Sequence, residues 1–301
     1  MPSNKLAVYT TVYPGVQKYL GAWAHSISQQ TDSHFDLWIG VDSLDIEEIV
    51  KAFGKELHPN WVLNSSGRSS TQLRITAINE LALAYSSIVF VDSDDLLDPS
   101  RIEAARSYLE NFGVVATALR IINETGNDLG LTFGIDHDRD IDSLMPRYNV
   151  FGLSNTAYRA EVLRCCLPLS DESELLDWQL ATRAWIKGAS LGFDHTPRMF
   201  YRQYGSNTAR VLQPFSARYV SMATLKVLDH YRCLVRSRED MPLRFRDQLL
   251  VAGNRVEKFF ESISRSKETL EKYVESLNRI EPEYVWWWCI AHPKLEAIWN
   301  N

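Results

Sequence analysis

The chain has 301 residues, of which 45% are hydrophobic and 23% are charged, a composition typical of a globular protein with one domain of ordinary size and a smaller one. Its formal net charge of -6 and pI near 5.7 argue against an extended nucleic-acid-binding surface. The N-terminus lacks the basic start and apolar stretch of a signal peptide, and the longest apolar run, at 284–291, is far shorter than a membrane-spanning helix. We therefore expect a cytoplasmic protein, attached at most to the inner face of a membrane.

The first hundred residues alternate short apolar runs with segments of helical periodicity. The predicted strands are 5–12, 35–41 and 87–91, and the predicted helices are about 16–27, 45–53 and 70–84. This alternation is typical of a mostly parallel sheet with helices on both faces, in which ligands bind at the C-terminal ends of the strands. The sequence therefore predicts an α/β fold.

The second hundred residues continue the pattern, and the last ninety depart from it. The predicted elements are a helix from Pro99 to about Asn111, a hairpin over 114–130, a helix over about 172–188, short strands at 190–195 and 198–203, and helices over 215–237, 242–263 and 267–279. Because no convincing strand follows residue 213, we predict a sheet-containing part at 1–213 and a helical C-terminal region at 214–301.

An acidic segment, Asp92-Ser93-Asp94-Asp95, directly follows the third predicted strand. Carboxylates crowded in this way repel one another, and a hard divalent cation such as Mg²⁺ or Mn²⁺ would convert the repulsion into coordination through oxygen. A solvated acidic turn that caps the next helix is the alternative. At the carboxyl end of a strand in an α/β sheet we favour a metal site formed by Asp92 and Asp94.

Five segments in order resemble the family 2 glycosyltransferases, which have the GT-A fold, and the resemblance covers about residues 5–210. The segments are the opening strand, helix and strand ending in "WIGVDS", the helix and strand "LRITAINELALAYSSIVFVDSDD", the acceptor-side "VFGLSNTAYRAEVL", the helix "LLDWQLATRAWIKG" and the closing "MFYRQYGSNTA". Each segment alone is a weak signal, and their order makes the signal specific. The resemblance divides 1–213 into a nucleotide-sugar half at about 1–97 and an acceptor half at about 98–213.

The resemblance implies a metal-dependent transfer of a sugar from a nucleotide diphosphate donor to a hydroxyl acceptor, with inversion at the anomeric carbon. Asp92, Ser93 and Asp94 match the D-x-D motif, whose cation, Mn²⁺ or Mg²⁺, bridges the motif and the donor diphosphate. Asp177 aligns with the general base of inverting members. The alternative for Asp177 is an ordinary carboxylate on a helix surface.

The resemblance also implies residues that contact the donor. They are Thr10, Thr11 and Tyr13 at the end of the first strand, Asp42 after the second strand, Arg74 on the helix before the D-x-D motif, and Arg202 and Asn207 in the closing segment. A solvated turn explains Asp42 about as well, a surface ion pair could explain Arg74, and a structural strand edge remains an alternative for Arg202 and Asn207.

Three residues depart from the family pattern. Val41 replaces a common aspartate, so the UDP-sugar that the family favours as donor loses one base contact. Leu176 occupies the position of the acidic residue that lies beside the base in the family. Only Glu174 could take over the role of that residue. Tyr204 replaces a histidine that binds the metal in some members, and a phenol is a poor ligand for a hard cation.

The C-terminal region offers two features that the resemblance does not cover. Trp286, Trp287 and Trp288 with Tyr284 could lie at a membrane interface, stack on a sugar or pack a C-terminal helix onto the body, and we favour packing. Five arginines, at positions 232, 236, 238, 244 and 246, form a solvated helix face or attract anionic lipid. The expected partners are thus a carbohydrate or lipid-linked glycan acceptor and, through this region, a membrane surface or a second copy, with no nucleic acid.

Two other functions compete with sugar transfer. A catalytically inactive GT-A-like binding or scaffold protein would explain Val41, Leu176 and Tyr204, although Asp92, Asp94 and Asp177 are retained. A phosphohydrolase of the haloacid dehalogenase type has a similar aspartate motif, but there the motif follows the first strand of the domain. We therefore favour the glycosyltransferase, with bacterial surface polysaccharide or glycoconjugate assembly as its setting.

Overall fold

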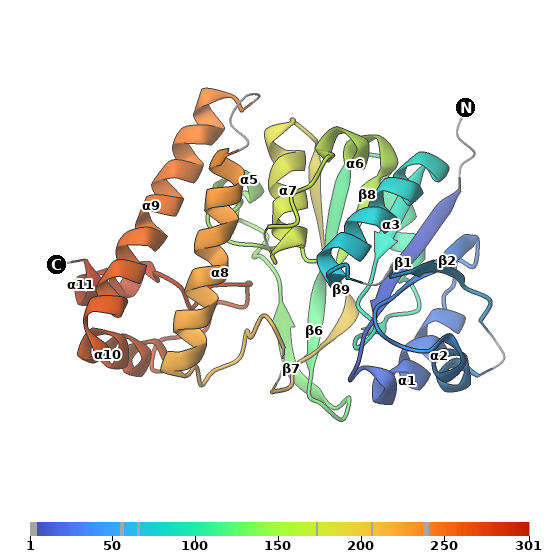
Figure 1. Ribbon diagram of the computed structural model, residues 1–301, viewed down its shortest axis with the longest axis horizontal. Coiled ribbons are helices and arrows are strands. Elements are labelled where there is room, and N and C mark those ends of the chain that lie inside the picture. Colours follow the sequence, from blue (N-terminus) through green and yellow to red (C-terminus); the bar gives the residue numbers. More distant parts are fainter. Residues whose placement is uncertain are drawn as a thin grey trace.

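A computed structural model describes residues 5–54, 57–64, 67–172, 174–205, 207–236 and 241–300, and it contains one nine-stranded sheet (Figure 1). The strand order is β3-β2-β1-β4-β8-β6-β9-β5, and β7 pairs with β6. The strands are β1 (Leu6–Val12), β2 (Phe35–Val41), β3 (Asn60–Leu63), β4 (Ser87–Phe90), β5 (Leu96–Leu97), β6 (Val114–Ile122), β7 (Asp128–Phe133), β8 (Thr156–Arg159) and β9 (Leu191–Arg202).

The helices cover both faces of this sheet and continue beyond it on one side (Figure 1). They are α1 (Gln17–Ser28), α2 (Ile46–Phe53), α3 (Ser70–Ala84), α4 (Arg101–Tyr108), α5 (Ile141–Leu144), α6 (Ala160–Cys166), α7 (Leu176–Ile186), α8 (Ala217–Arg236), α9 (Leu243–Arg265), α10 (Lys267–Leu277) and α11 (Glu296–Trp299), with a short 3₁₀ turn at Pro293–Leu295. The predicted α/β fold with a helical C-terminal region is confirmed. None of the described helices is long and apolar enough to cross a membrane.

The first half of the sheet is parallel and brings three strand ends to one edge. β1 pairs in parallel with both β2 and β4, and every residue of β1 is buried. Burial on both faces explains why β1 is a nearly continuous apolar run rather than an alternating one. Beyond β4 the antiparallel β8 is inserted before β6. The loops after β1, β2 and β4 therefore meet at the same edge.

The closing strand differs from the prediction. Sequence analysis gave two short strands at 190–195 and 198–203, whereas β9 is one continuous strand over Leu191–Arg202. Its pairing with β6 shifts register, since Thr117 is opposite Asp194 and Leu119 is opposite Met199. The irregularity accommodates Pro197, which has no N–H for the ladder. The break that the sequence predicts between two strands is therefore a bulge within one strand.

Two further elements differ from the sequence-based prediction. The short strand β3 was not predicted, because only four residues with little alternation form it at the sheet edge. Helix α7 begins at Leu176, not near residue 172. The later start places Asp177 in the first turn of this helix, where its carboxylate is near the unpaired N–H groups.

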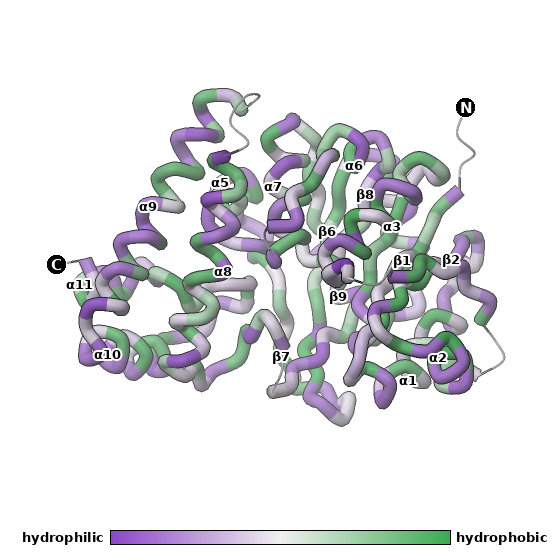
Figure 2. The backbone as a smooth tube through the Cα atoms, viewed as in Figure 1, coloured by the Kyte–Doolittle hydropathy of each residue, from purple (hydrophilic) through white to green (hydrophobic). Residues whose placement is uncertain are grey.

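The C-terminal helices α8, α9 and α10 lie to one side of the sheet, with α8 packed against α7 (Figure 1). Apolar and polar residues alternate along α8 and α9, as Figure 2 shows, so each helix buries one face. One continuous hydrophobic core extends from Leu6 in β1 to Trp299 in α11. The helical region therefore shares its core with the sheet.

The Trp-rich tail packs back onto the sheet-containing part, which confirms the predicted packing. Trp286, Trp287 and Trp288 are 4%, 4% and 0% exposed. Trp286 forms a β-bridge with Asn149, and its ring centroid lies 4.1 Å from that of Phe133. These contacts bring the C-terminal segment to the sheet edge where the loops after β1, β2 and β4 meet.

Part of the arginine group forms ordinary surface ion pairs. Arg232 pairs with Asp229 at 3.6 Å and with Glu257 at 3.5 Å, and Arg236 pairs with Glu172 at 2.8 Å. Arg238 lies outside the described residues. The pairs favour a solvated helix face for this part of α8.

Candidate active site

The loops at the carboxyl edge of the sheet surround a cavity of about 580 Å³. Its lining includes Tyr13, Asp42, Arg74, Asp92, Asp94 and Asp177. These residues come from segments far apart in the sequence, and the parallel strand ends bring them together. Small-molecule sites in proteins have volumes of about 300–1,000 Å³, and the volume of this cavity falls within that range.

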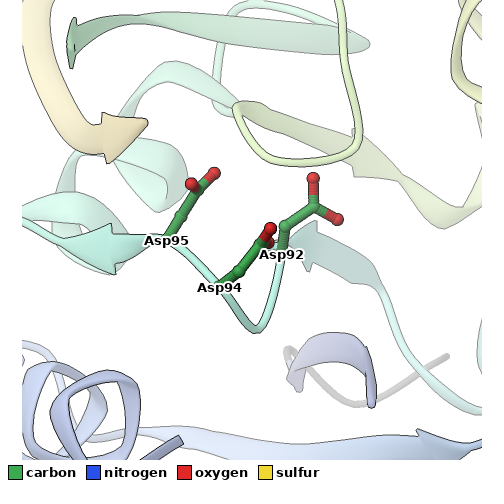
Figure 3. Close-up of side chains that lie close together, drawn as sticks. All are labelled: Asp92, Asp94 and Asp95. Carbon is green, nitrogen blue, oxygen red and sulfur yellow. The ribbon is translucent and has the colours of Figure 1, made fainter. Parts of the chain in front are cut away.

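Three aspartates occupy the tight turn between β4 and β5 and point to the same side of it (Figure 3). One carboxylate oxygen from each of Asp92, Asp94 and Asp95 lies within 4.8 Å of the others. Asp95 is 1% exposed and accepts hydrogen bonds from the Arg202 N–H at 2.7 Å and from the Ser154 hydroxyl. Asp95 thus stabilises the turn, while Asp92 and Asp94 face the cavity.

The crowding changes how these acids hold their protons. Burial, and then the charge of Asp94, raise the pKa of Asp92 to about 7. Burial, and then the charge of Asp94, also raise the pKa of Asp95 well above its usual value. Because a divalent cation would offset this repulsion and the ligands are carboxylate oxygens, the turn fits Mg²⁺ or Mn²⁺. The described residues contain no other such group of three potential ligands.

Two tyrosines hold the carboxylate of Asp94. The Tyr204 hydroxyl donates to Asp94 Oδ2 at 2.6 Å, and the Tyr13 hydroxyl donates to the same oxygen at 3.4 Å. Burial and the Asp94 charge raise the pKa of Tyr204, so this phenol remains a donor. Tyr204 therefore positions one of the aspartates through its hydroxyl group. Sequence reasoning missed this role, because it considered only direct coordination.

Asp177 reaches the cavity from the first turn of α7. Asn149 Nδ2 donates to Asp177 Oδ2 at 2.7 Å, and Asn149 Oδ1 accepts from the N–H of Phe151, so the amide orientation is fixed. Burial raises the pKa of Asp177, against opposing effects of the Trp178 N–H, Arg74 and Asn149. A held carboxylate with a raised pKa is a suitable proton acceptor. No local signal in the sequence pointed to Asn149, which lies in an irregular loop.

The end of β1 lies behind the cavity wall. Thr11 is 6% exposed and its hydroxyl accepts from Arg74 Nε at 3.4 Å, while Ser93 donates to the Thr11 carbonyl at 2.8 Å. Thr10 is 1% exposed, and its hydroxyl has no partner among the described residues. Of these residues only Arg74 lines the cavity. Thr10, Thr11 and Ser93 support the site from behind.

The other predicted donor contacts also divide into residues that line the cavity and residues buried behind its wall. Asp42 lines the cavity and accepts from Asn64 Nδ2 at 3.0 Å. Arg202 is 3% exposed, and its guanidinium donates to the carbonyls of Asp94 and Glu124 at 2.6 and 3.0 Å. Asn207 lines the cavity and donates to the Arg202 carbonyl at 3.0 Å. The buried guanidinium of Arg202 therefore holds the aspartate turn through the Asp94 carbonyl.

Two lining residues come from the C-terminal tail, Trp286 and Trp287. The sequence shows the tryptophans but contains no indication that the tail returns to this edge. Glu174 lines the cavity at an exposed position and forms an ion pair with Lys226 of α8. Leu176, which precedes Asp177 in α7, also lines the cavity but is only 2% exposed. The C-terminal region is thus part of the cavity wall.

The architecture, with its aspartate turn at the end of β4, defines a GT-A-like α/β fold. Comparison of the sequence with protein-family models and with curated proteins finds no match. Solved structures are similar. The mannosyltransferase PcManGT from Pyrobaculum calidifontis, in complex with GDP-Man and Mn²⁺, superposes with a TM-score of 0.57 at 13% identity, over 83% of this chain and 69% of that one. S. aureus TarS 1-349, in complex with UDP-GlcNAc, superposes with a TM-score of 0.58 at 15% identity, over 90% of this chain and 78% of that one.

Proposed function

We propose that this protein is a glycosyltransferase of family 2 type that transfers a sugar from a nucleotide diphosphate donor to a hydroxyl acceptor. The observation that carries the proposal is a single cavity that joins Asp92 and Asp94 of the β4–β5 turn to Asp177 of α7. This transfer requires carboxylates that can bind a metal ion and, near them, a separate carboxylate held in position to accept a proton. The nucleotide sugars bound to the two similar proteins support the proposal.

Asp92 and Asp94 would hold Mn²⁺ or Mg²⁺, with Tyr13 and Tyr204 fixing the orientation of Asp94. The ion supplies electrostatic stabilisation of the negative charge that develops on the leaving diphosphate. Asp95 and Arg202 keep the turn rigid, because their hydrogen bonds join it to β9. A rigid turn holds both ligands in place without reorganisation during the reaction.

Asp177 acts as the general base. It takes the proton from the acceptor hydroxyl while that oxygen forms a bond to the anomeric carbon and the bond from this carbon to the diphosphate oxygen breaks. Attack on the face opposite the leaving group inverts the anomeric configuration. Asn149 is the positioning residue, because its amide fixes the carboxylate of Asp177.

Donor and acceptor contacts follow from the lining. Arg74 and Asp42 lie on the nucleotide side, for which a UDP-sugar is the proposed donor. The proposed acceptor is a carbohydrate or lipid-linked glycan, and Trp286 and Trp287, each 4% exposed, would contact it only through the ring surface that lines the cavity. We further propose that residues 1–213 form the sheet-containing part and residues 214–301 the helical C-terminal region. The proposed location is the cytoplasm, with peripheral membrane contact or self-association through the C-terminal region. The proposed setting is the assembly of a bacterial surface polysaccharide or glycoconjugate.

A donor panel tests this function. UDP-, GDP-, dTDP- and ADP-sugars are incubated with the protein and Mn²⁺, Mg²⁺ or EDTA, and release of the nucleoside diphosphate is measured. We expect turnover of at least one donor that requires a divalent ion. Tight donor binding without turnover would instead support the scaffold alternative, and hydrolysis of p-nitrophenyl phosphate would support the phosphohydrolase.

A further inference from the structure

A second cavity of about 590 Å³ lies in the C-terminal region, between α8, α9, the loop after α5 and the Trp-rich tail. Its lining includes Arg147, Tyr231, Val251, Arg255, Trp287 and Ile290. The volume again falls in the range of small-molecule sites, about 300–1,000 Å³. Apart from Trp287, which lines both cavities, the proposed sugar transfer uses none of these residues.

Much of the wall is apolar. Val227 of α8, Val256 of α9 and Ile290 of the tail are 2%, 6% and 5% exposed. Val251 of α9 also lines the cavity, yet it is 70% exposed, so it marks the opening to solvent. An apolar chain inserted past Val251 would leave water for a hydrophobic wall, which is favourable in proportion to the area buried.

The same wall contains buried nitrogen donors that lack acceptors. The Arg147 guanidinium lies over the Tyr148 ring, 4.9 Å from its centroid, and its Nη2 is buried with no hydrogen-bond partner among the described residues. Arg255 donates to the Ala291 carbonyl at 3.0 Å and to Glu296 at 2.8 Å, which leaves its Nη2 buried without a partner. Nε1 of Trp287, a side chain only 4% exposed, is also unpaired among the described residues. Donors left in this state are unfavourable unless a ligand accepts from them.

The charges near the cavity favour an anion. The hydrogen bond from Arg255, and further the positive charge of Arg147, lower the pKa of Glu296, so both guanidinium groups act on this one carboxylate. Glu296 is not among the lining residues, and the acid that does line the cavity, Asp247, is exposed at the rim. Among the described lining residues, the guanidinium groups of Arg147 and Arg255 against the single carboxylate of Asp247 leave a net positive charge beside an apolar space.

We propose that this cavity binds an anionic amphiphile, a carboxylate or phosphate group attached to an apolar chain. The head group accepts hydrogen bonds from Arg147 and Arg255, and the chain packs against the apolar wall of α8 and α9. Trp287 lines both this cavity and the active-site cavity, and it has a φ of 69°, which is unfavourable for a residue with a side chain. Strained backbone of this kind occurs preferentially at ligand sites.

Calorimetric titration of the full chain, without nucleotide, tests the proposal. The probes are octyl phosphate and octanoate, with octanol lacking the charge and inorganic phosphate lacking the chain. We expect both anionic amphiphiles to bind at least about tenfold more tightly than either control, since a charge-assisted hydrogen bond contributes about 1.5–3 kcal/mol. Tighter binding of octyl phosphate would indicate a lipid phosphate as the ligand, and tighter binding of octanoate would indicate a fatty acid. Octanol or inorganic phosphate binding equally well, or no probe binding, would overturn the proposal.

Variants assign the binding to this cavity. Arg147→Gln should weaken octyl phosphate at least about tenfold, while Arg265→Gln, the same change at an exposed position of α9, should leave affinity unchanged. If Arg147→Gln does not fold, Val251→Asp places a like charge at the exposed opening and should weaken binding comparably. Unchanged affinity in the folded variants would refute the site. Sugar transfer is measured without amphiphile, so either proposal can fail alone.

Discussion

The two cavities differ in chemistry although their volumes are nearly equal, about 580 and 590 Å³. The first contains Asp92, Asp94 and Asp177, whereas the second contains Arg147 and Arg255 in a mainly apolar wall. Volume therefore says little about the ligand, and the sign and pairing of the buried charges say more. The acidic cavity suits a cation with a diphosphate, and the basic cavity suits an anion with an apolar chain.

The two cavities also differ in how the chain builds them. Strand ends of a parallel sheet form the acidic cavity, so its residues follow strand signals that are visible in the sequence. Helix faces and the tail form the basic cavity, and its arginines lie more than a hundred residues apart with no motif. The following substitutions test the comparison.

The largest expected effect concerns the metal ligands. Asp94→Asn removes a charged ligand while the side-chain volume is kept, so divalent-ion-dependent turnover should fall by at least about 10⁴-fold, equivalent to several kcal/mol of transition-state stabilisation. Steady-state release of nucleoside diphosphate measures it. Asp138→Asn, at an exposed position, is the matched control and should retain full activity. Near-normal turnover in Asp94→Asn would remove the metal site from the mechanism.

Loss of the proposed base should be somewhat less severe. Asp177→Asn should lower kcat by about 10²–10⁴-fold, because general base catalysis contributes in that range. Binding of the donor with Mn²⁺, measured by calorimetry, should change little, since the proposed role is on the acceptor side. A loss of donor affinity with unchanged kcat would place Asp177 in donor binding instead.

The pH dependence of stability depends on the acidic turn. The pKa of Asp92, about 7 in the folded protein, lies above its usual 3.8, so the folded state retains a proton that the unfolded state has released between those values. The free energy of unfolding should therefore fall as pH rises from about 4 to 7, by at most about 1.4 kcal/mol per pH unit. Thermal melts without divalent ions should show a smaller fall for Asp92→Asn, and equal slopes would contradict the assignment.

The smallest expected effect concerns the tail shared by both cavities. A Cβ at Gly152 would lie 2.5 Å from Trp286, so Gly152→Ala should displace the tail and lower the free energy of unfolding by about 1–3 kcal/mol. Urea denaturation measures this change. Gly205→Ala is the matched control, because a Cβ there meets no atom within 4 Å. Equal stability of the two variants would show that the tail does not depend on this close contact.

Much of the candidate active site was accessible from the sequence because strand ends converge at one edge of the sheet. Asp92, Asp94, Asp177, Arg74 and Asp42 were all expected there, and all line the cavity. Their individual roles stay predictions until they are measured.

The supporting residues were inaccessible to sequence reasoning for a physical reason. Asn149 belongs to an irregular loop with no periodic signal, and Trp286 reaches the cavity only through the return of the tail. Both depend on contacts between segments distant in the chain, which local propensity does not encode. For the same reason the sequence predicts two short strands at 190–195 and 198–203, where β9 is one strand with a bulge.

The amino-acid sequence by itself determined the alternation of strands and helices, the helical C-terminal region and the acidic turn after β4, because each depends on local periodicity and residue type. Only the tertiary structure decided that Asp95 and Arg202 stabilise the turn, that Tyr204 holds Asp94, and that a basic cavity lies behind Trp287. Those features depend on burial and on distances between remote side chains. These quantities arise only when the chain has folded.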